Sequence, residues 1–284
     1  TGMGVSALYE NTTGELNAAF GIYALAANTT SECNTAIGAC ALSDQTTGSQ
    51  NVAVGWAALK TNTTAHYNTA VGTGAMHLNT TGCLNTASGF KALFSNTTAS
   101  YNTAVGSCAL GANTTGAGNT AVGQFSLKTN TTGASNAGLG ANTLQANTTG
   151  GSNIAIGDCA LLNNTTASHN IGIGHGALCD ATTGDSNTAV GGVAMENTTT
   201  GSFNIAMGKY ALNGNTTGCR NTGLGYAALI YNTTGIYNTA VGACALYNNT
   251  TGRNTAIGFM SMTANTTGTR NTASGIYSLC KNTT

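Results

Sequence analysis

An asparagine recurs every 17 residues along the chain, and this period limits the fold more than any other feature. The series runs from Asn17 to Asn238 and resumes at Asn254 and Asn271, after one repeat that is a residue short. Numbered from this asparagine, the consensus repeat is N-T-A-V-G-x-x-A-L-x-x-N-T-T-G-x-x. Position 5 is glycine in all seventeen repeats, positions 13 and 14 are threonine throughout, and position 9 is always Leu or Met. Because a fixed period is the signature of repeat architectures, one repeat should be one structural unit.

The composition of the repeat favours strands over helices. Seventeen residues are too few for the common helical repeats, and Gly, Asn and Thr are poor helix formers. Thr-Ala-Val-Gly alternates with period 2, so positions 2 and 4 face one way and positions 3 and 5 the other. Position 1 and the Asn-Thr-Thr-Gly at positions 12 to 15 are typical turn residues, since Asn tolerates and Gly readily adopts a left-handed φ. We predict an all-β fold, a parallel β-solenoid (β-roll) of about seventeen coils, with two short strands and two turns in each coil.

Stacked coils place identical residues directly above one another. Asparagine side chains can then form amide ladders and threonine side chains hydroxyl rows along the coil axis. Replacing one rung leaves polar groups of both neighbours unpaired, at a cost of about 1–3 kcal/mol each when they are buried. The residues that we expect to form structural ladders are Asn34, Asn51, Asn68, Asn85 and Asn102 at position 1, and Gly38, Gly55, Gly72, Gly89 and Gly106 at position 5.

The overall composition excludes several functions. Charged residues make up 6% of the chain and the formal net charge is zero, so we expect no binding to nucleic acid. No run of 18 apolar residues occurs, so we expect no insertion into a membrane. Because the first and last residues both lie inside a repeat, we interpret residues 1–284 as a single continuous array cut from a longer fibre.

The core that one coil can offer is thin. Only positions 4 and 9 carry bulky apolar residues, beside small alanines at positions 3 and 8. A face made only of Ala and Gly lets another backbone approach closely. We therefore expect a parallel homotrimer in which the Ala/Gly face is the interface shared between chains.

The segments Asn68–Gly72 and Asn238–Gly242, both Asn-Thr-Ala-Val-Gly, resemble the repeats of trimeric autotransporter adhesin heads of the YadA type. The whole repeat is also similar to arrays in phage tail-fibre proteins. The resemblance covers essentially the full chain and implies a left-handed, trimeric β-roll in an extracellular or virion-surface fibre. This sequence differs from adhesin heads in its period, which is 17 rather than about 14 residues, and in the Thr-Thr pair of every coil.

The Asn-Thr-Thr of the second turn, assigned to position 12, is an N-glycosylation sequon. It has two interpretations: a glycan coat along one edge of the fibre, or a turn whose side chains form a ladder between coils. The candidate acceptors are Asn11, Asn28, Asn62, Asn79, Asn96, Asn113, Asn130, Asn147, Asn164, Asn197, Asn215, Asn232, Asn249, Asn265 and Asn282.

The remaining chemistry-bearing residues predict no site. Adjacent threonines at positions 13 and 14 give one outward file, where an ice-binding surface would use more. The nine cysteines form no C-x-x-C pair, although neighbouring-coil couples such as Cys159 and Cys179 could bridge. Four histidines and eight acidic residues fall on variable positions, so we expect no catalytic residues, metal or cofactor. Aromatic residues such as Trp56 and Tyr237 have two interpretations: ordinary packing at the edges of the turns, which we favour, or shallow contact patches for a carbohydrate or protein receptor.

The sequence therefore predicts a non-enzymatic structural or adhesive shaft of an extracellular or virion-surface fibre. Its partners are expected to be copies of itself, in a homotrimer or filament, and a host-surface carbohydrate or protein receptor. Two alternatives stay open: an N-glycosylated extracellular fibril whose glycan coat is the functional surface, and an ice-binding β-solenoid that uses its threonine rows.

Overall fold

The computed structural model describes all 284 residues and contains seventeen short parallel strands and no helix. By its internal contacts the chain divides into two compact units, unit 1 (Thr1–Asn142 and Asn147–Thr149) and unit 2 (Thr143–Ala146 and Gly150–Thr284). Unit 1 contains the strands β1 (Gly2–Met3), β2 (Ala18–Phe20), β3 (Thr35–Ile37), β4 (Val52–Val54), β5 (Thr69–Val71), β6 (Thr86–Ser88), β7 (Thr103–Val105), β8 (Thr120–Val122) and β9 (Ala137–Leu139). Unit 2 contains β10 (Ile154–Ile156), β11 (Ile171–Ile173), β12 (Thr188–Val190), β13 (Ile205–Met207), β14 (Thr222–Leu224), β15 (Thr239–Val241), β16 (Thr255–Ile257) and β17 (Thr272–Ser274).

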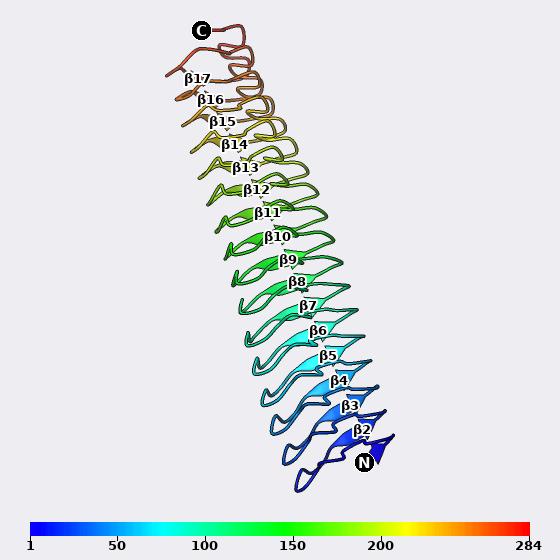
Figure 1. Ribbon diagram of the computed structural model, residues 1–284. Helices are drawn as coiled ribbons and strands as arrows, with labels where there is room; N and C mark the ends of the chain where they lie inside the picture. The colour runs from blue at the N-terminus through cyan, green and yellow to red at the C-terminus, as the bar shows by residue number, and fades with distance from the viewer. The chain divides into compact units, whose positions relative to one another are not determined.

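The predicted all-β parallel β-solenoid is confirmed. Within each unit every strand pairs in parallel with the strand of the next coil, so the coils stack in sequence order (Figure 1). Thr69 pairs with Thr86 and Ala70 with Ala87, a shift of one 17-residue repeat. Each coil contributes one strand, of two residues in β1 and three in the others, rather than the two strands that we predicted, because the rest of the coil consists of turns.

The short repeat keeps this register by losing one residue from the Thr-Thr turn. Thr239 pairs with Thr255, sixteen residues on. The carbonyl of Thr251 accepts hydrogen bonds from Nδ2 of Asn238 and Nδ2 of Asn249, as the position-15 carbonyl does in regular coils. Arg253 donates its backbone N–H to the Ile236 carbonyl, as residues at position 17 do. Thr251 therefore stands at position 15, so the expected pair of threonines at positions 13 and 14 is not kept in this coil.

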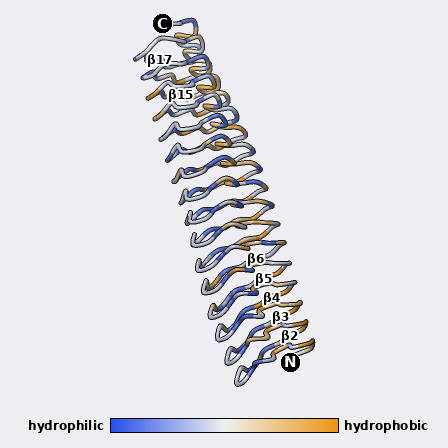
Figure 2. Tube along the Cα trace, viewed as in Figure 1, coloured by the Kyte–Doolittle hydropathy of each residue, from blue (hydrophilic) through white to orange (hydrophobic).

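The interior of each coil is lined by small side chains. The alanines at positions 3 and 8 and the Leu or Met at position 9 are almost all fully buried, for example Ala70, Ala75 and Met76. The position-4 residue, such as Val71, points outward and is 40% exposed. The alternation along the strand was predicted correctly, but the expectation that position 4 belongs to the core was wrong. Hydrophilic and hydrophobic stretches recur from coil to coil along the tube in Figure 2.

The same finding overturns the predicted trimer interface. The position-3 alanine lies inside its own coil, because only a side chain of this size fits between the closely spaced backbone layers of a thin coil. The Ala/Gly face is therefore not available to other chains.

The turns are not built as we predicted. Left-handed φ angles occur at positions 7, 9 and 17, for example 60° at Tyr67 and 49° at Met76, and among all asparagines only Asn142 has a positive φ. Residues other than glycine pay a conformational cost in this region, so the surroundings must hold them there. Hydrogen bonds between coils do so: the Met76 N–H donates to the Ala92 carbonyl (2.9 Å).

Glycine at position 5 is required for two separate reasons. Gly72 has a φ of +132°, and a Cβ on it would lie 2.4 Å from the carbonyl oxygen of Gly89 in the next coil. Within each unit, successive coils stack backbone on backbone at this point, whereas Gly275 in the last coil keeps the positive φ (+121°) with nothing within 4 Å of an added Cβ.

Candidate functional site

The position-1 asparagines close each coil and bind it to its neighbour. The Asn68 backbone N–H donates to Oδ1 of Asn51 in the preceding coil (3.0 Å). Its Nδ2 donates to the carbonyl of Gly82 at position 15 of its own coil (2.9 Å). One buried amide therefore joins the start of the coil to its end and also joins two coils. The predicted ladder residues Asn34, Asn51, Asn68, Asn85 and Asn102 are all buried in this row.

The position-12 asparagines form a second buried ladder. Nδ2 of Asn79 donates to Oδ1 of Asn62 in the preceding coil and to the Gly82 carbonyl, both at 2.9 Å. Its own Oδ1 accepts from Nδ2 of Asn96 (2.7 Å). Both amide hydrogens are thus donated inside the protein. Gln45, Ala181 and Thr198 replace asparagine in three coils.

This geometry separates the candidate glycosylation sites into two groups. Position-12 asparagines between two coils, such as Asn62 and Asn79, are fully buried, so a glycan on their Nδ2 is incompatible with the folded ladder. Asn11 and Asn282 stand at position 12 of the first and last coils and are half-buried. Asn197 stands one position earlier than we assigned it, at position 11, and is exposed.

Two further position-11 asparagines start sequons that we missed. Asn163 and Asn248 precede a position-12 asparagine in Asn-Asn-Thr, so they too are followed by threonine at the third residue. Asn163 is exposed and Asn248 is half-buried. Nδ2 of Asn163 donates to Oδ1 of Asp180 (3.0 Å), and Nδ2 of Asn248 donates to the Thr263 carbonyl (3.0 Å). Reading the Asn-Asn-Thr triplets in both registers would have found them.

The two threonines of the turn have different roles. The position-13 hydroxyl donates to the position-13 carbonyl of the next coil, for example from Thr80 to Thr97 (3.0 Å). The position-14 threonine, such as Thr81, is exposed. The turn therefore presents one outward file of threonines.

The cysteines and histidines do not assemble into a reactive site. All nine cysteines are thiols, so Cys159 and Cys179 are not bridged. Burial raises the pKa of the Cys179 thiol to about 11, and the neighbouring Asp180 carboxylate adds to the shift. His77 stacks on Phe94 with ring centroids 5.1 Å apart. No group of three or more His, Cys, Asp or Glu side chains is placed to hold a metal ion.

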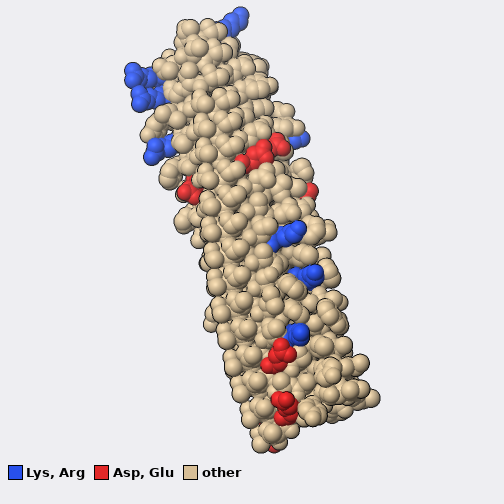
Figure 3. Space-filling view, in the orientation of Figure 1, with Lys and Arg blue, Asp and Glu red and all other residues tan.

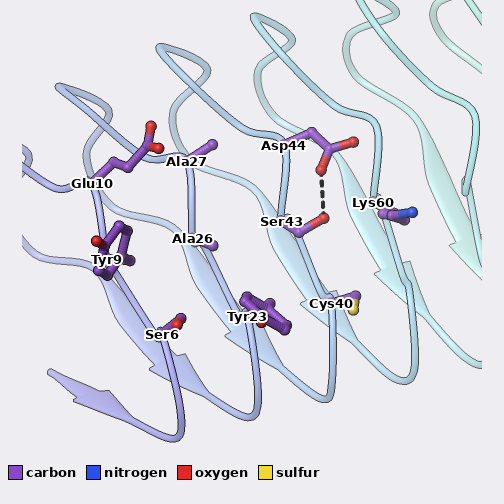
Figure 4. A pocket seen from close by; sticks show the side chains of 10 residues that line it. All are labelled: Ser6, Tyr9, Glu10, Tyr23, Ala26, Ala27, Cys40, Ser43, Asp44 and Lys60. Carbon is purple, nitrogen blue, oxygen red and sulfur yellow. Dashed lines mark hydrogen bonds between the residues drawn. The ribbon is translucent and has the colours of Figure 1, made fainter.

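An open groove of about 410 Å³ lies on unit 1. Its side chains come from positions 7, 10 and 11 of successive coils, among them Tyr23, Cys40 and Lys60. Ser43 donates a hydrogen bond to Asp44 (2.7 Å), and the other side chains stand apart along the coils without converging on one point (Figure 4). The groove is a surface furrow between rows of side chains rather than an enclosed site.

The charged residues follow an order along the chain, although the acidic ones fall on variable positions of the repeat. Four acidic residues lie between residues 10 and 44, three lysines between 60 and 128, and four acidic residues between 158 and 196. Residues 197–284 then contain five basic residues and no carboxylate side chain. In Figure 3 the charged side chains nearest the C-terminal end are accordingly all basic. The order of signs in the sequence was sufficient to show this.

No model of a known protein family matches the chain, and no curated protein matches it. The structure contains no helix long and apolar enough to cross a membrane.

Proposed function

We propose that the chain is a structural shaft segment of an extracellular or virion-surface fibre and has no enzymatic activity. The observation that carries the proposal is the pair of buried asparagine ladders. In these ladders the buried asparagines of each coil form hydrogen bonds with the adjacent coils. Repetition of the coil therefore adds length and stiffness rather than a binding cavity. The similarity of the repeat to adhesin-head and tail-fibre arrays supports the same role.

In this proposal the fibre is built from parallel copies of the chain, as a homotrimer or filament. The strand face at positions 2 and 4 is the surface that the copies share. Its position-4 side chains form a row of exposed aliphatic groups, such as Ile37, Val71 and Val105, which are 38–43% exposed. Burial of such a row between chains is favourable at roughly 25 cal/mol per Å² of apolar surface.

The test is the oligomeric state of the chain, measured by light scattering coupled to size-exclusion chromatography over a range of concentrations. We expect a trimer or higher filament that dissociates when Val71, Val105 and Val122 are all replaced by Thr, which keeps their shape. Replacing Thr64, Thr81 and Thr98 at position 14 by Ser is the matched control and should leave assembly unchanged. A chain that stays monomeric at every concentration would refute the self-association.

A glycan-coated fibril is the second candidate function, and the position-11 sequons favour it. Asn163, Asn197 and Asn248 are accessible, and N-glycosylation would leave each Nδ2 one hydrogen for its bond to the next coil. Glycopeptide mass spectrometry of the chain secreted from a glycosylating host should find sugar on these three and none on Asn62 or Asn79. Sugar on the ladder asparagines of the folded protein would contradict this assignment. The single exposed threonine file gives the ice-binding alternative no comparable support.

A further inference from the structure

Position 17 of five successive coils in unit 2 forms an exposed column of aromatic and basic side chains. All five residues are exposed, and their φ angles lie between 56° and 66°. Adjacent coils lie about 4.8 Å apart, so the column presents one side chain at each such step. No Lys or Arg occupies position 17 in any earlier coil. The column consists of Phe203, Arg220, Tyr237, Arg253 and Arg270.

The first part of the column is held rigid by stacking. The Arg220 guanidinium lies between the rings of Phe203 and Tyr237, at 5.4 and 5.5 Å from their centroids. Its Nη1 also donates to the Tyr237 hydroxyl (3.1 Å). These contacts fix the orientation of the guanidinium and leave other N–H groups free to donate outward.

The second part of the column carries two guanidinium groups on adjacent coils. Arg253 and Arg270 line an open groove of about 330 Å³ together with Ile236, Gly252 and Thr269. The one short repeat of the chain lies here: it lacks one residue of the Thr-Thr turn, so Gly252 stands at position 16, directly before Arg253. The register defect, the groove and the paired arginines thus coincide.

The charges of the column are not neutralised within this part of the chain. Residues 197–284 contain no Asp or Glu, and neighbouring guanidinium groups repel one another. An anion between them would relieve this repulsion and accept bidentate hydrogen bonds. A linear row of donors matches a linear ligand with repeated anionic groups better than a compact one.

We propose that this column binds an acidic polysaccharide, whose carboxylate or sulfate groups pair in succession with Arg220, Arg253 and Arg270. The alternative polyanion, single-stranded nucleic acid, needs free aromatic faces on which bases stack. Here one face of each ring is already covered by Arg220. Binding is a property of the column and does not depend on assembly of the chain into a fibre.

The test is fluorescence anisotropy of the full chain with labelled polygalacturonate, heparin and an oligothymidylate of similar length. The variant R253Q/R270Q should lose at least about tenfold in affinity for one of the two polysaccharides. The control K209Q/K281Q removes the same charge from exposed lysines outside the column, and should lose less than about twofold. R253K/R270K keeps the positive charge but lacks the planar guanidinium that donates two parallel hydrogen bonds, so it should recover only part of the affinity. Salt should weaken binding to the unmodified chain more steeply than binding to R253Q/R270Q.

Equal losses in the arginine and lysine variants would overturn the proposal, because binding would then follow net charge alone. So would tighter binding of the oligothymidylate than of either polysaccharide, or no binding of any probe. Unchanged circular dichroism of all three variants establishes that the comparison concerns folded protein.

Discussion

Replacement of Asn79 by Ala breaks the position-12 ladder at one rung in the middle of unit 1. Three hydrogen bonds disappear: two from Asn79 Nδ2, to Asn62 Oδ1 and to the Gly82 carbonyl, and one from Asn96 Nδ2 to Asn79 Oδ1. The Gly82 carbonyl keeps the Asn68 amide as a donor (2.9 Å). Two buried groups therefore lose their partner, Oδ1 of Asn62 and one N–H of Asn96.

Each such group costs about 1–3 kcal/mol, so the substitution should destabilise the surrounding coils by roughly 2–6 kcal/mol. Hydrogen exchange followed by mass spectrometry is the suitable assay, because a repeat array can open locally without unfolding as a whole. Amides in the coils of Asn62, Asn79 and Asn96 should lose protection, while coils farther away keep theirs.

Two control substitutions separate the effect of breaking the ladder from the effect of shortening a side chain. Thr81 is exposed and lies in the same turn, so Thr81→Ala should alter stability by no more than about 0.5 kcal/mol. Asn282 is half-buried in the last coil; its Nδ2 lies 3.5 Å from Asn265 Oδ1 and donates to the nearby Thr284 carbonyl (2.7 Å). Because no following coil donates to it, Asn282→Ala should cost less than Asn79→Ala. If Asn79→Ala changes protection no more than these two, the reasoning about buried ladders is refuted.

Three further predictions follow from the same geometry. Gly89→Ala should destabilise more than Gly275→Ala by at least about 1–3 kcal/mol in urea unfolding, because both have a positive φ but only Gly89 faces a backbone 2.5 Å from the added Cβ; equal costs would show that the φ alone matters. Thr198→Asn should stabilise unit 2 by no more than about 1 kcal/mol, since Asn215 reaches the Thr198 hydroxyl only at 3.4 Å and an asparagine Oδ1 would be a better acceptor, while Ala181 in the preceding coil offers the new amide no partner; a lower unfolding midpoint would contradict it. Cys179, whose pKa burial raises to about 11, should react with iodoacetamide more slowly at pH 8 than exposed Cys33, and its rate should rise as the pH approaches 11. Asp180→Asn should speed the Cys179 reaction, and an unchanged rate would exclude the carboxylate as a cause.

The period predicted the fold because it fixes which residues stack. Register, parallel pairing and the asparagine rows all follow from placing residue i above residue i+17, and the structure shows them at Asn68 and Asn79. The alternation of the strand separated position 3 from position 4 correctly. It could not say which face is inside, since Ala70 and Val71 are both apolar, and the choice depends on how closely the rest of the coil approaches.

The turns could not be predicted from local propensity. Left-handed φ angles fall on residues such as Met76 and Tyr67, which carry none of the usual sequence signs of that conformation. Contacts between coils, rather than the residues themselves, impose these angles. The arginine column, in contrast, could have been found by aligning position 17 of successive repeats, since Arg220, Arg253 and Arg270 occupy the same place in the repeat.

A cross-section of the assembled protein at side-chain resolution, by electron cryo-microscopy, tests the central claim most directly. The account predicts two interior rows of asparagine amides in every chain, with the position-3 alanine inside the coil and the position-4 valine or isoleucine outside. It also predicts more than one chain in the section, in contact through that outer row. Valine side chains inside the coil, or asparagines of positions 1 and 12 pointing to solvent, would contradict it.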